Sequence, residues 1–116
     1  ATSVDRDGTG DGYDHELTKN IADAVSIPVI AHGGAGCPDD VADVIRKTGV
    51  AAVAVASVLH YDAIRSLVFS NEDSSEGNTE FLRSGKGVAR VDAAGIAALK
   101  QHLSANGVPC RMEVTV

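Results

Sequence analysis

The residues best suited to chemistry lie in three segments, each of which directly follows a short apolar run. The segments are Asp5-Arg6-Asp7-Gly8, His32-Gly33-Gly34 and Ala56-Ser57. If the apolar runs are parallel strands, their carboxyl ends meet at one edge, which is where α/β proteins bind ligands. Glycine lets backbone N–H groups approach an anion closely, and a serine hydroxyl adds a further donor. The spacing therefore predicts one phosphate site, shared by N–H groups at Gly8, Gly34 and Ser57.

The middle segment allows the most specific structural prediction of the three. Residues 28–36 read PVIAHGGAG, an apolar run that enters three glycines and is followed by Pro38. This order predicts a buried strand, a turn with exposed backbone, and a helix N-terminus whose partial positive charge suits an anion. The same pattern also fits a plain tight turn, so by itself it does not decide between the two.

Two carboxylates in the first segment have more than one interpretation. Neighbouring carboxylates can split their pKa values and act as an acid and a base, which Asp5 and Asp7 could do. Asp5 equally fits an ion pair with Arg6 or a bond to a loop amide. Asp7 fits a role in capping or orienting the turn, because a bare carboxylate facing a phosphate would repel it.

The four histidines and Tyr13 can likewise be assigned either a ligand-binding role or a structural one. His32 is a candidate donor to a ligand, and His60 fits either that role or a structural one at a strand end. His15 and His102 fall on expected helices, where we expect them to be solvated. Tyr13 is expected to pack within a loop.

The apolar periodicity alternates between strands and helices. We expect strands over residues 1–5, 27–31 and 50–59, and helices over residues 15–25, 38–48, 63–69 and from Asp92 to about residue 105. A tail strand is expected from Arg111 onward. Strands that alternate with helices are typical of consecutive βα units and a parallel sheet. The fold class is therefore α/β.

Caps and apolar positions support these elements. Asp14 and Asp92 are expected N-caps, and Gly49 and Asn106-Gly107 are expected helix ends. The expected inward positions are Leu17, Ile21 and Ala24-Val25 in the first helix, Val41, Val44, Ile45 and Thr48 in the second, and Ile96, Leu99 and Leu103 in the last. Residues 27–31 are apolar at every position, so we expect helices to cover both faces of that strand.

Composition limits the class of protein. The 116 residues carry a net charge of −6, which argues against nucleic-acid and anionic-membrane partners, and aromatics make up only 3%, so the core must be aliphatic. No apolar run could span a bilayer and no signal peptide precedes the first strand, so a cytoplasmic location is expected. Cys37 and Cys110 have no metal-ligand spacing and fit core or cap roles. No metal or cofactor is expected.

Length and the two ends bound the domain. At 116 residues the chain is one domain, and residues 70–90 form a polar, acidic insertion within it, with an exposed loop at 70–80. The chain starts at Ala1 without Met, inside an expected strand. This start indicates a piece of a longer protein or a trimmed chain.

Together these stretches resemble the cyclase subunit of imidazole glycerol phosphate synthase, a (β/α)₈ barrel of histidine biosynthesis. The resembling stretches are residues 2–9 (TSVDRDGT), 12–14 (GYD), 28–36 (PVIAHGGAG), 56–61 (ASVLHY) and 96–111 (IAALKQHLSANGVPCR). They cover nearly everything except about residues 63–90. The resemblance implies a partial barrel: about three βα units, strands six to eight, with a C-terminal helix and a tail strand.

The resemblance also implies which residues act. The family's acid and base are aspartates on its first and fifth strands, which this chain lacks, so no catalytic residue is assigned. The family's second phosphate site implies Asp7, Gly8, Gly34, Ala56 and Ser57 as phosphate-binding residues. Thr9, His32 and Gly33 are candidate further ligand contacts. His32 stands where the family often has a small residue, which suggests a changed ligand.

Two functions follow from the resemblance. In a full barrel, the chain would form the phosphate-binding part of an ammonia-dependent cyclase that works with a glutaminase subunit. The alternative is a non-catalytic, self-associating module that binds a phosphorylated small molecule, from a gene fragment or a divergent relative that amidates sugars. Open strand edges on a free-standing piece would then favour a homo-oligomer.

Overall fold

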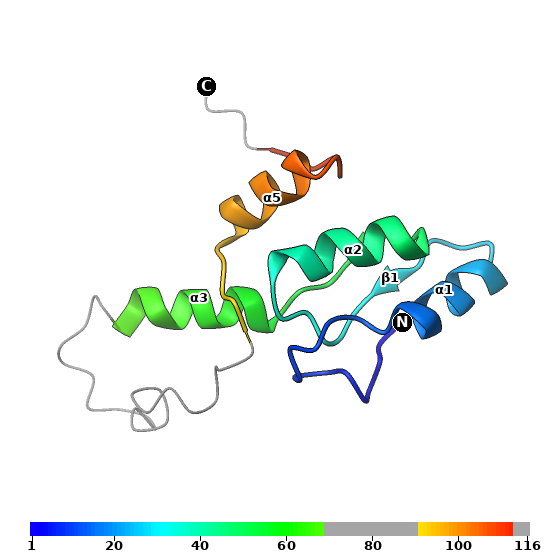
Figure 1. Ribbon diagram of the computed structural model, residues 1–116, viewed down its shortest axis with the longest axis horizontal. Helices are drawn as coiled ribbons and strands as arrows, with labels where there is room; N and C mark the ends of the chain where they lie inside the picture. Colours follow the sequence, from blue (N-terminus) through cyan, green and yellow to red (C-terminus); the bar gives the residue numbers. More distant parts are fainter. Residues whose placement is uncertain (69–90, 113–116) are drawn as a thin grey trace.

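Two short parallel strands and four helices make up the computed structural model, which describes residues 1–68 and 91–112 (Figure 1). In chain order these are α1 (His15–Ala24), β1 (Ile30–Ala31), α2 (Pro38–Thr48), β2 (Ala52–Val53), α3 (Ser57–Val68) and α5 (Ile96–Ala105). Ile30 pairs with Ala52 and Ala31 with Val53, and α2 connects the two strands. This βαβ unit confirms the predicted parallel α/β class. The acidic insertion at 70–90 lies outside the described residues.

The first segment runs beside β1, but it is not the strand predicted over residues 1–5. Only Thr2 forms a bridge, parallel to His32. The N–H of His32 donates to the Ala1 carbonyl over 2.9 Å, and the N–H of Ser3 donates to the His32 carbonyl over 3.2 Å. The prediction was too long because the chain turns at once: the Asp7 N–H closes back onto the Ser3 carbonyl over 3.0 Å.

The other two strands are also shorter than predicted. β1 begins at Ile30 rather than residue 27, and β2 ends at Val53 rather than residue 59. The apolar run after β2 turns into α3, which begins at Ser57 and not at residue 63. A continuous run of Val, Ala and Leu fits a strand and a buried helix equally well, which is why the pattern misplaced this boundary.

Among the described residues, helices cover one face of the strands and none covers the other. Ala31 is fully buried, whereas its neighbour Ile30 is 53% exposed. Ala52 on β2 and Ala54 directly after it are exposed as well. The expectation that both faces are covered was therefore wrong: α2 packs against α1, α5 and β2, and no described element lies over Ile30.

Helix α1 begins as predicted but packs through a partly different stripe. The Asp14 carboxylate accepts from the Leu17 N–H over 3.0 Å, which confirms the N-cap. Leu17 and Val25 are 39% and 41% exposed, whereas Thr18 is buried. Ile21 does pack against the core as predicted, together with Ala22, so the covered side of α1 matches the predicted stripe only in part. This side faces α2.

Helix α2 confirms its prediction at both ends and along its face. Val41 and Val44 are fully buried, and Thr48 is buried at the last turn. Gly49 ends the helix with a left-handed φ of 70°, where its N–H donates to the Ile45 carbonyl. Such an end strongly favours glycine because an added Cβ penalises positive φ.

Helix α5 starts later than predicted. Its N-cap is Gly95 rather than Asp92, and the Asp92 N–H donates to the Gly36 carbonyl. Leu99 and Leu103 are buried as expected, but Ile96 is 55% exposed at the helix start. The predicted end at Asn106-Gly107 is confirmed.

Two further expectations concern the C-terminal part. His102 is not merely solvated, since its Nε2 lies 2.7 Å from an Asp39 carboxylate oxygen and joins α5 to α2. Arg111 and Met112 form no strand, and the rest of the predicted tail strand lies outside the described residues.

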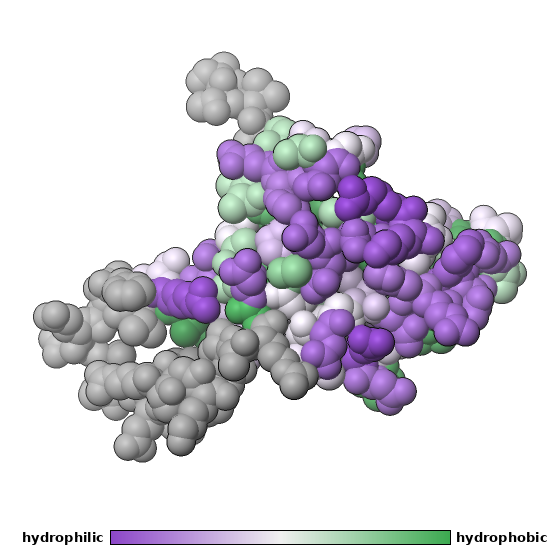
Figure 2. All heavy atoms as spheres, viewed as in Figure 1, coloured by the Kyte–Doolittle hydropathy of each residue, from purple (hydrophilic) through white to green (hydrophobic). Residues whose placement is uncertain are grey.

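The core is aliphatic, as the composition requires. Its buried members are Tyr13, Val29, Ala31, Ala35, Val41, Ala42, Val44, Val50, Val58, Val91, Leu99, Leu103 and Val108. Cys37 takes the N-cap position of α2, and Cys110 packs against the core, in keeping with the cap and core roles expected for them. Hydrophilic residues cover most of the face shown in Figure 2, with hydrophobic ones between them over α3 and α5. None of the helices in the described ranges has the length and apolar character needed to cross a membrane.

Candidate phosphate site

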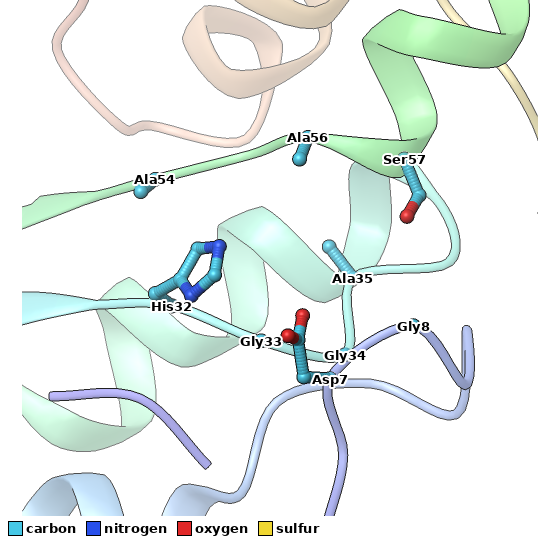
Figure 3. Close-up of a pocket in the computed structure, with 9 residues that line it drawn as sticks. All are labelled: Asp7, Gly8, His32, Gly33, Gly34, Ala35, Ala54, Ala56 and Ser57. Carbon is cyan, nitrogen blue, oxygen red and sulfur yellow. The ribbon is translucent and has the colours of Figure 1, made fainter. Parts of the chain in front are cut away.

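A shallow hollow lies where the three segments singled out in the sequence meet (Figure 3). Its lining residues are Asp7, Gly8, His32, Gly33, Gly34, Ala35, Ala54, Ala56 and Ser57. All five residues expected to bind phosphate are among them, and so are the candidate contacts His32 and Gly33. The candidate contact Thr9 is not in the lining, because its hydroxyl donates to the Arg6 carbonyl over 2.7 Å and orders the turn.

The Gly33-Gly34 turn forms the floor of the hollow and depends on glycine at both positions. Their φ angles are 94° and 105°, in the region that favours glycine. A Cβ on Gly34 would overlap the carbonyl oxygen of Gly12 and lie 2.9 Å from the Arg6 Cβ. The neighbouring loop therefore packs directly on this turn and leaves no space for a side chain.

Loop 8–13 is hydrogen-bonded to the turn and to the residue that follows β2. The Gly12 N–H donates to the Gly34 carbonyl over 2.8 Å, and the Tyr13 hydroxyl donates to the Ala54 carbonyl over 3.0 Å. Tyr13 is buried, as expected for a loop packing residue. Burial raises the pKa of Tyr13 to about 12, and the nearby Asp40 carboxylate adds to the rise. The neutral phenol, which can donate this bond, is thus kept across the ordinary pH range.

The N-terminus of α2 is not free for a ligand, contrary to the expectation from the glycine turn. The Asp40 carboxylate accepts from the Gly36 N–H over 2.8 Å and from the Cys37 N–H over 3.2 Å. An acidic side chain of the helix itself therefore occupies the groups that were expected to hold an anion. Burial is the largest cause that raises the pKa of the Cys37 thiol at this end.

The helix that does present its N-terminus to the hollow is α3. Ser57 is its first residue and lines the hollow, with the hydroxyl directed into it in Figure 3. The first N–H of the helical ladder is that of His60, which donates to the Ala56 carbonyl over 2.9 Å. The N–H groups of Ser57, Val58 and Leu59 precede that bond and lack helical acceptors. The sequence pattern missed this helix start, although a serine before a helical run was a usable signal.

The two ionisable side chains of the lining are a carboxylate and an imidazole. Figure 3 shows the Asp7 carboxylate and the His32 ring both extending into the space between the glycine turn and β2. Within the described residues the Asp7 carboxylate accepts no hydrogen bond, so it does not cap the turn as expected; only its backbone N–H does. His32 Nδ1 lies 3.3 Å from the Thr2 hydroxyl.

The part of the chain that forms the hollow is also the part that matches a known protein family. The family model described as "Histidine biosynthesis protein" matches residues 1–65, which contain every residue of the hollow. The chain belongs to the histidine biosynthesis protein family.

Individual members of the histidine biosynthesis family match about half of the chain. This chain is 54% identical over 61 residues to the imidazole glycerol phosphate synthase subunit HisF of Nitrosopumilus maritimus. The alignment covers 53% of this chain and 23% of that protein. HisF of Metallosphaera sedula is 53% identical over 64 residues, covering 55% of this chain and 26% of that protein. HisF of Nitratidesulfovibrio vulgaris is 52% identical over 59 residues, with 51% and 23% covered. The chain thus spans about a quarter of the length of the relatives it matches.

Some polar residues of this family member lie outside the hollow. Asp5 is exposed, and the Arg6 guanidinium donates to the Asp11 carbonyl over 3.2 Å. His60 is exposed on α3, where its ring meets that of Tyr61 edge-on at a centroid distance of 5.5 Å. His60 therefore sits on a helix rather than at a strand end, and it does not line the hollow.

Proposed function

We propose that this chain binds the phosphate group of a small-molecule ligand in the hollow between the Gly33-Gly34 turn, Gly8 and the start of α3. The observation that carries the proposal is the placement of Ser57 and its helical N-terminus in the hollow, opposite the glycine turn. Unpaired N–H groups and the helix dipole both favour an anion at such a place. The loops after late strands and the N-terminus of an extra helix are a frequent phosphate site in (β/α)₈ barrels.

The histidine biosynthesis family gives this site a context. We propose that the described elements form part of a (β/α)₈ barrel and hold one phosphate of the substrate of an imidazole glycerol phosphate synthase cyclase. In that longer protein a glutaminase subunit would supply ammonia. By itself the chain would bind ligand without turnover, since the family's catalytic aspartates belong to strands that it lacks.

Titration with inorganic phosphate tests the site through Ser57→Asp. A carboxylate at the first position of a helix interacts favourably with the helix dipole, so the free energy of unfolding should not fall. The same carboxylate would occupy the hollow and repel phosphate, which should weaken binding by a factor of about ten or more. Binding is measured by calorimetry on the full chain, and unfolding by urea denaturation.

Ser66→Asp is the matched control. Ser66 lies on the same helix, is exposed, and is not among the lining residues. Its substitution adds the same charge to α3 and should leave phosphate affinity within about twofold. If the two variants bind phosphate equally well, the hollow is not the site.

A second candidate function rests on the uncovered strand face. Ile30 on β1, Ala52 on β2 and Ala54 directly after β2 are all exposed. Apolar surface of this kind is usually buried, and two copies of the chain that pack these faces together would form a self-associating, non-catalytic ligand-binding module. Light scattering should then give a mass of two or more chains, with a shift toward a single chain in Ile30→Lys. A single-chain mass for the unmodified protein would rule this candidate out.

A further inference from the structure

His32 is the one side chain in the lining of the hollow that can become a cation. Of the other eight lining residues, seven are Gly, Ala or Ser and one is Asp7. Both backbone groups of His32 bond to the first segment: its N–H donates to the Ala1 carbonyl, and its carbonyl accepts from the Ser3 N–H. The position of the His32 Cα is therefore set by this pairing. An anion in the hollow therefore meets one imidazole and one carboxylate.

The ring is oriented by one contact. The Thr2 hydroxyl lies 3.3 Å from Nδ1, and no described residue bonds to Nε2. In Figure 3 the ring extends from its strand toward β2, with one nitrogen directed into the hollow. In a protonated ring both nitrogens donate, so Nδ1–H bonds to Thr2 while Nε2–H is left for a ligand oxygen.

We propose that His32 is a proton-dependent specificity residue, whose protonated form supplies the cationic contact to the bound oxyanion. This inference rests on the proposed phosphate site and assigns its charge recognition to one side chain. It selects a ligand class: oxyanions with two negative charges, such as a phosphate monoester, are held tightly when His32 is protonated and less tightly when it is neutral.

The charges around His32 explain why its protonation matters. The segment before Gly8 contributes the Asp7 carboxylate to the lining. The β2 side contributes only Ala54 and Ala56, and the start of α3 contributes Ser57. With a neutral imidazole the charged side chain that an anion meets in the lining is a carboxylate. Protonation of His32 offsets that charge, which removes the net repulsion, and adds a charged N–H donor that can contact the anion directly.

Inorganic sulfate is the probe, because its charge stays constant over the range in which histidines titrate. Sulfate affinity of the full chain is measured at about pH 5.5 and about pH 8, values that bracket the usual titration of imidazoles. We expect binding to be about fivefold or more tighter at the lower pH. His32→Gln should lose this difference and keep the weaker affinity at both pH values, with its free energy of unfolding unchanged.

Two further variants separate the alternatives. His60→Gln removes an exposed histidine outside the hollow and should keep the full pH difference. Asp7→Asn should bind sulfate more tightly at both pH values and also keep the difference. The inference is overturned if the unmodified chain binds sulfate equally at both pH values, if His32→Gln keeps the difference, or if Asp7→Asn or His60→Gln loses it. Absence of any sulfate or phosphate binding by the unmodified chain would instead overturn the proposed site itself.

Discussion

Gly34→Ala is expected to lower the free energy of unfolding by about 2–6 kcal/mol. The φ of 105° at Gly34 is strained for alanine, at a cost of about 1–3 kcal/mol. The new Cβ would also overlap the Gly12 carbonyl oxygen and lie 2.9 Å from the Arg6 Cβ. Loop 8–13 would have to move away and would lose its bond from the Gly12 N–H to the Gly34 carbonyl, which adds a further cost of about 1–3 kcal/mol. Urea denaturation followed by circular dichroism measures the loss.

Gly8→Ala is the matched control for this prediction. Gly8 also has positive φ, at 75°, but no atom lies within 4 Å of the position that its Cβ would take. Only the backbone preference is lost, so the cost should be about 1–2 kcal/mol. Equal losses in the two variants would contradict the idea that the close approach of Gly12 makes Gly34 special. Because Gly34 supports the fold, Ser57 is the better position for testing anion binding.

Asp40→Ala is expected to cost about 2–3 kcal/mol of unfolding free energy. The Asp40 carboxylate accepts two backbone N–H groups, those of Gly36 and Cys37, at the start of α2. A hydrogen bond to a charged group contributes about 1.5–3 kcal/mol, and part of this is kept when water replaces the carboxylate. The helix that loses its cap carries Val41 and Val44 into the core, so the loss should appear in global unfolding.

Asp39→Ala provides the comparison within the same helical turn. Asp39 shares the helix dipole with Asp40, but its side chain is largely exposed and pairs only with His102 among the described residues. Exposed pairs of this kind contribute about 0–1 kcal/mol, so the loss should stay below about 1 kcal/mol. If Asp39→Ala destabilised the chain as much as Asp40→Ala, the two N–H bonds of Asp40 would not explain its effect.

Local sequence information was sufficient for the features that depend on a few neighbouring residues. The helix over residues 38–48, the Asp14 cap and the ends at Gly49 and Asn106 were predicted correctly. Each of these depends on side chains and backbone angles within one or two turns. The meeting of the three segments at one hollow was also predicted, because parallel strands place their carboxyl ends at the same edge.

The hollow's electrostatics could not be predicted in the same way. Asp40 and the glycine turn are adjacent in the sequence, but only the fold shows that this carboxylate takes the N–H groups that an anion was expected to use. The N–H groups that remain for an anion are those at the N-terminus of α3, and their position depends on where the apolar run after β2 becomes helical. Val58 is fully buried just there, so its packing selects the helix start.

By itself, the sequence determined the alternation of strands and helices, the glycine turn and most of the residues that line the hollow. Tertiary structure alone decided which apolar residues are covered: Ile30 and Leu17 are exposed, although their pattern matches that of buried neighbours. It also decided that His102 meets Asp39, 63 positions away in the chain. The physical reason is that turns and caps are short-range, whereas burial and charge pairing depend on partners that only the folded chain brings together.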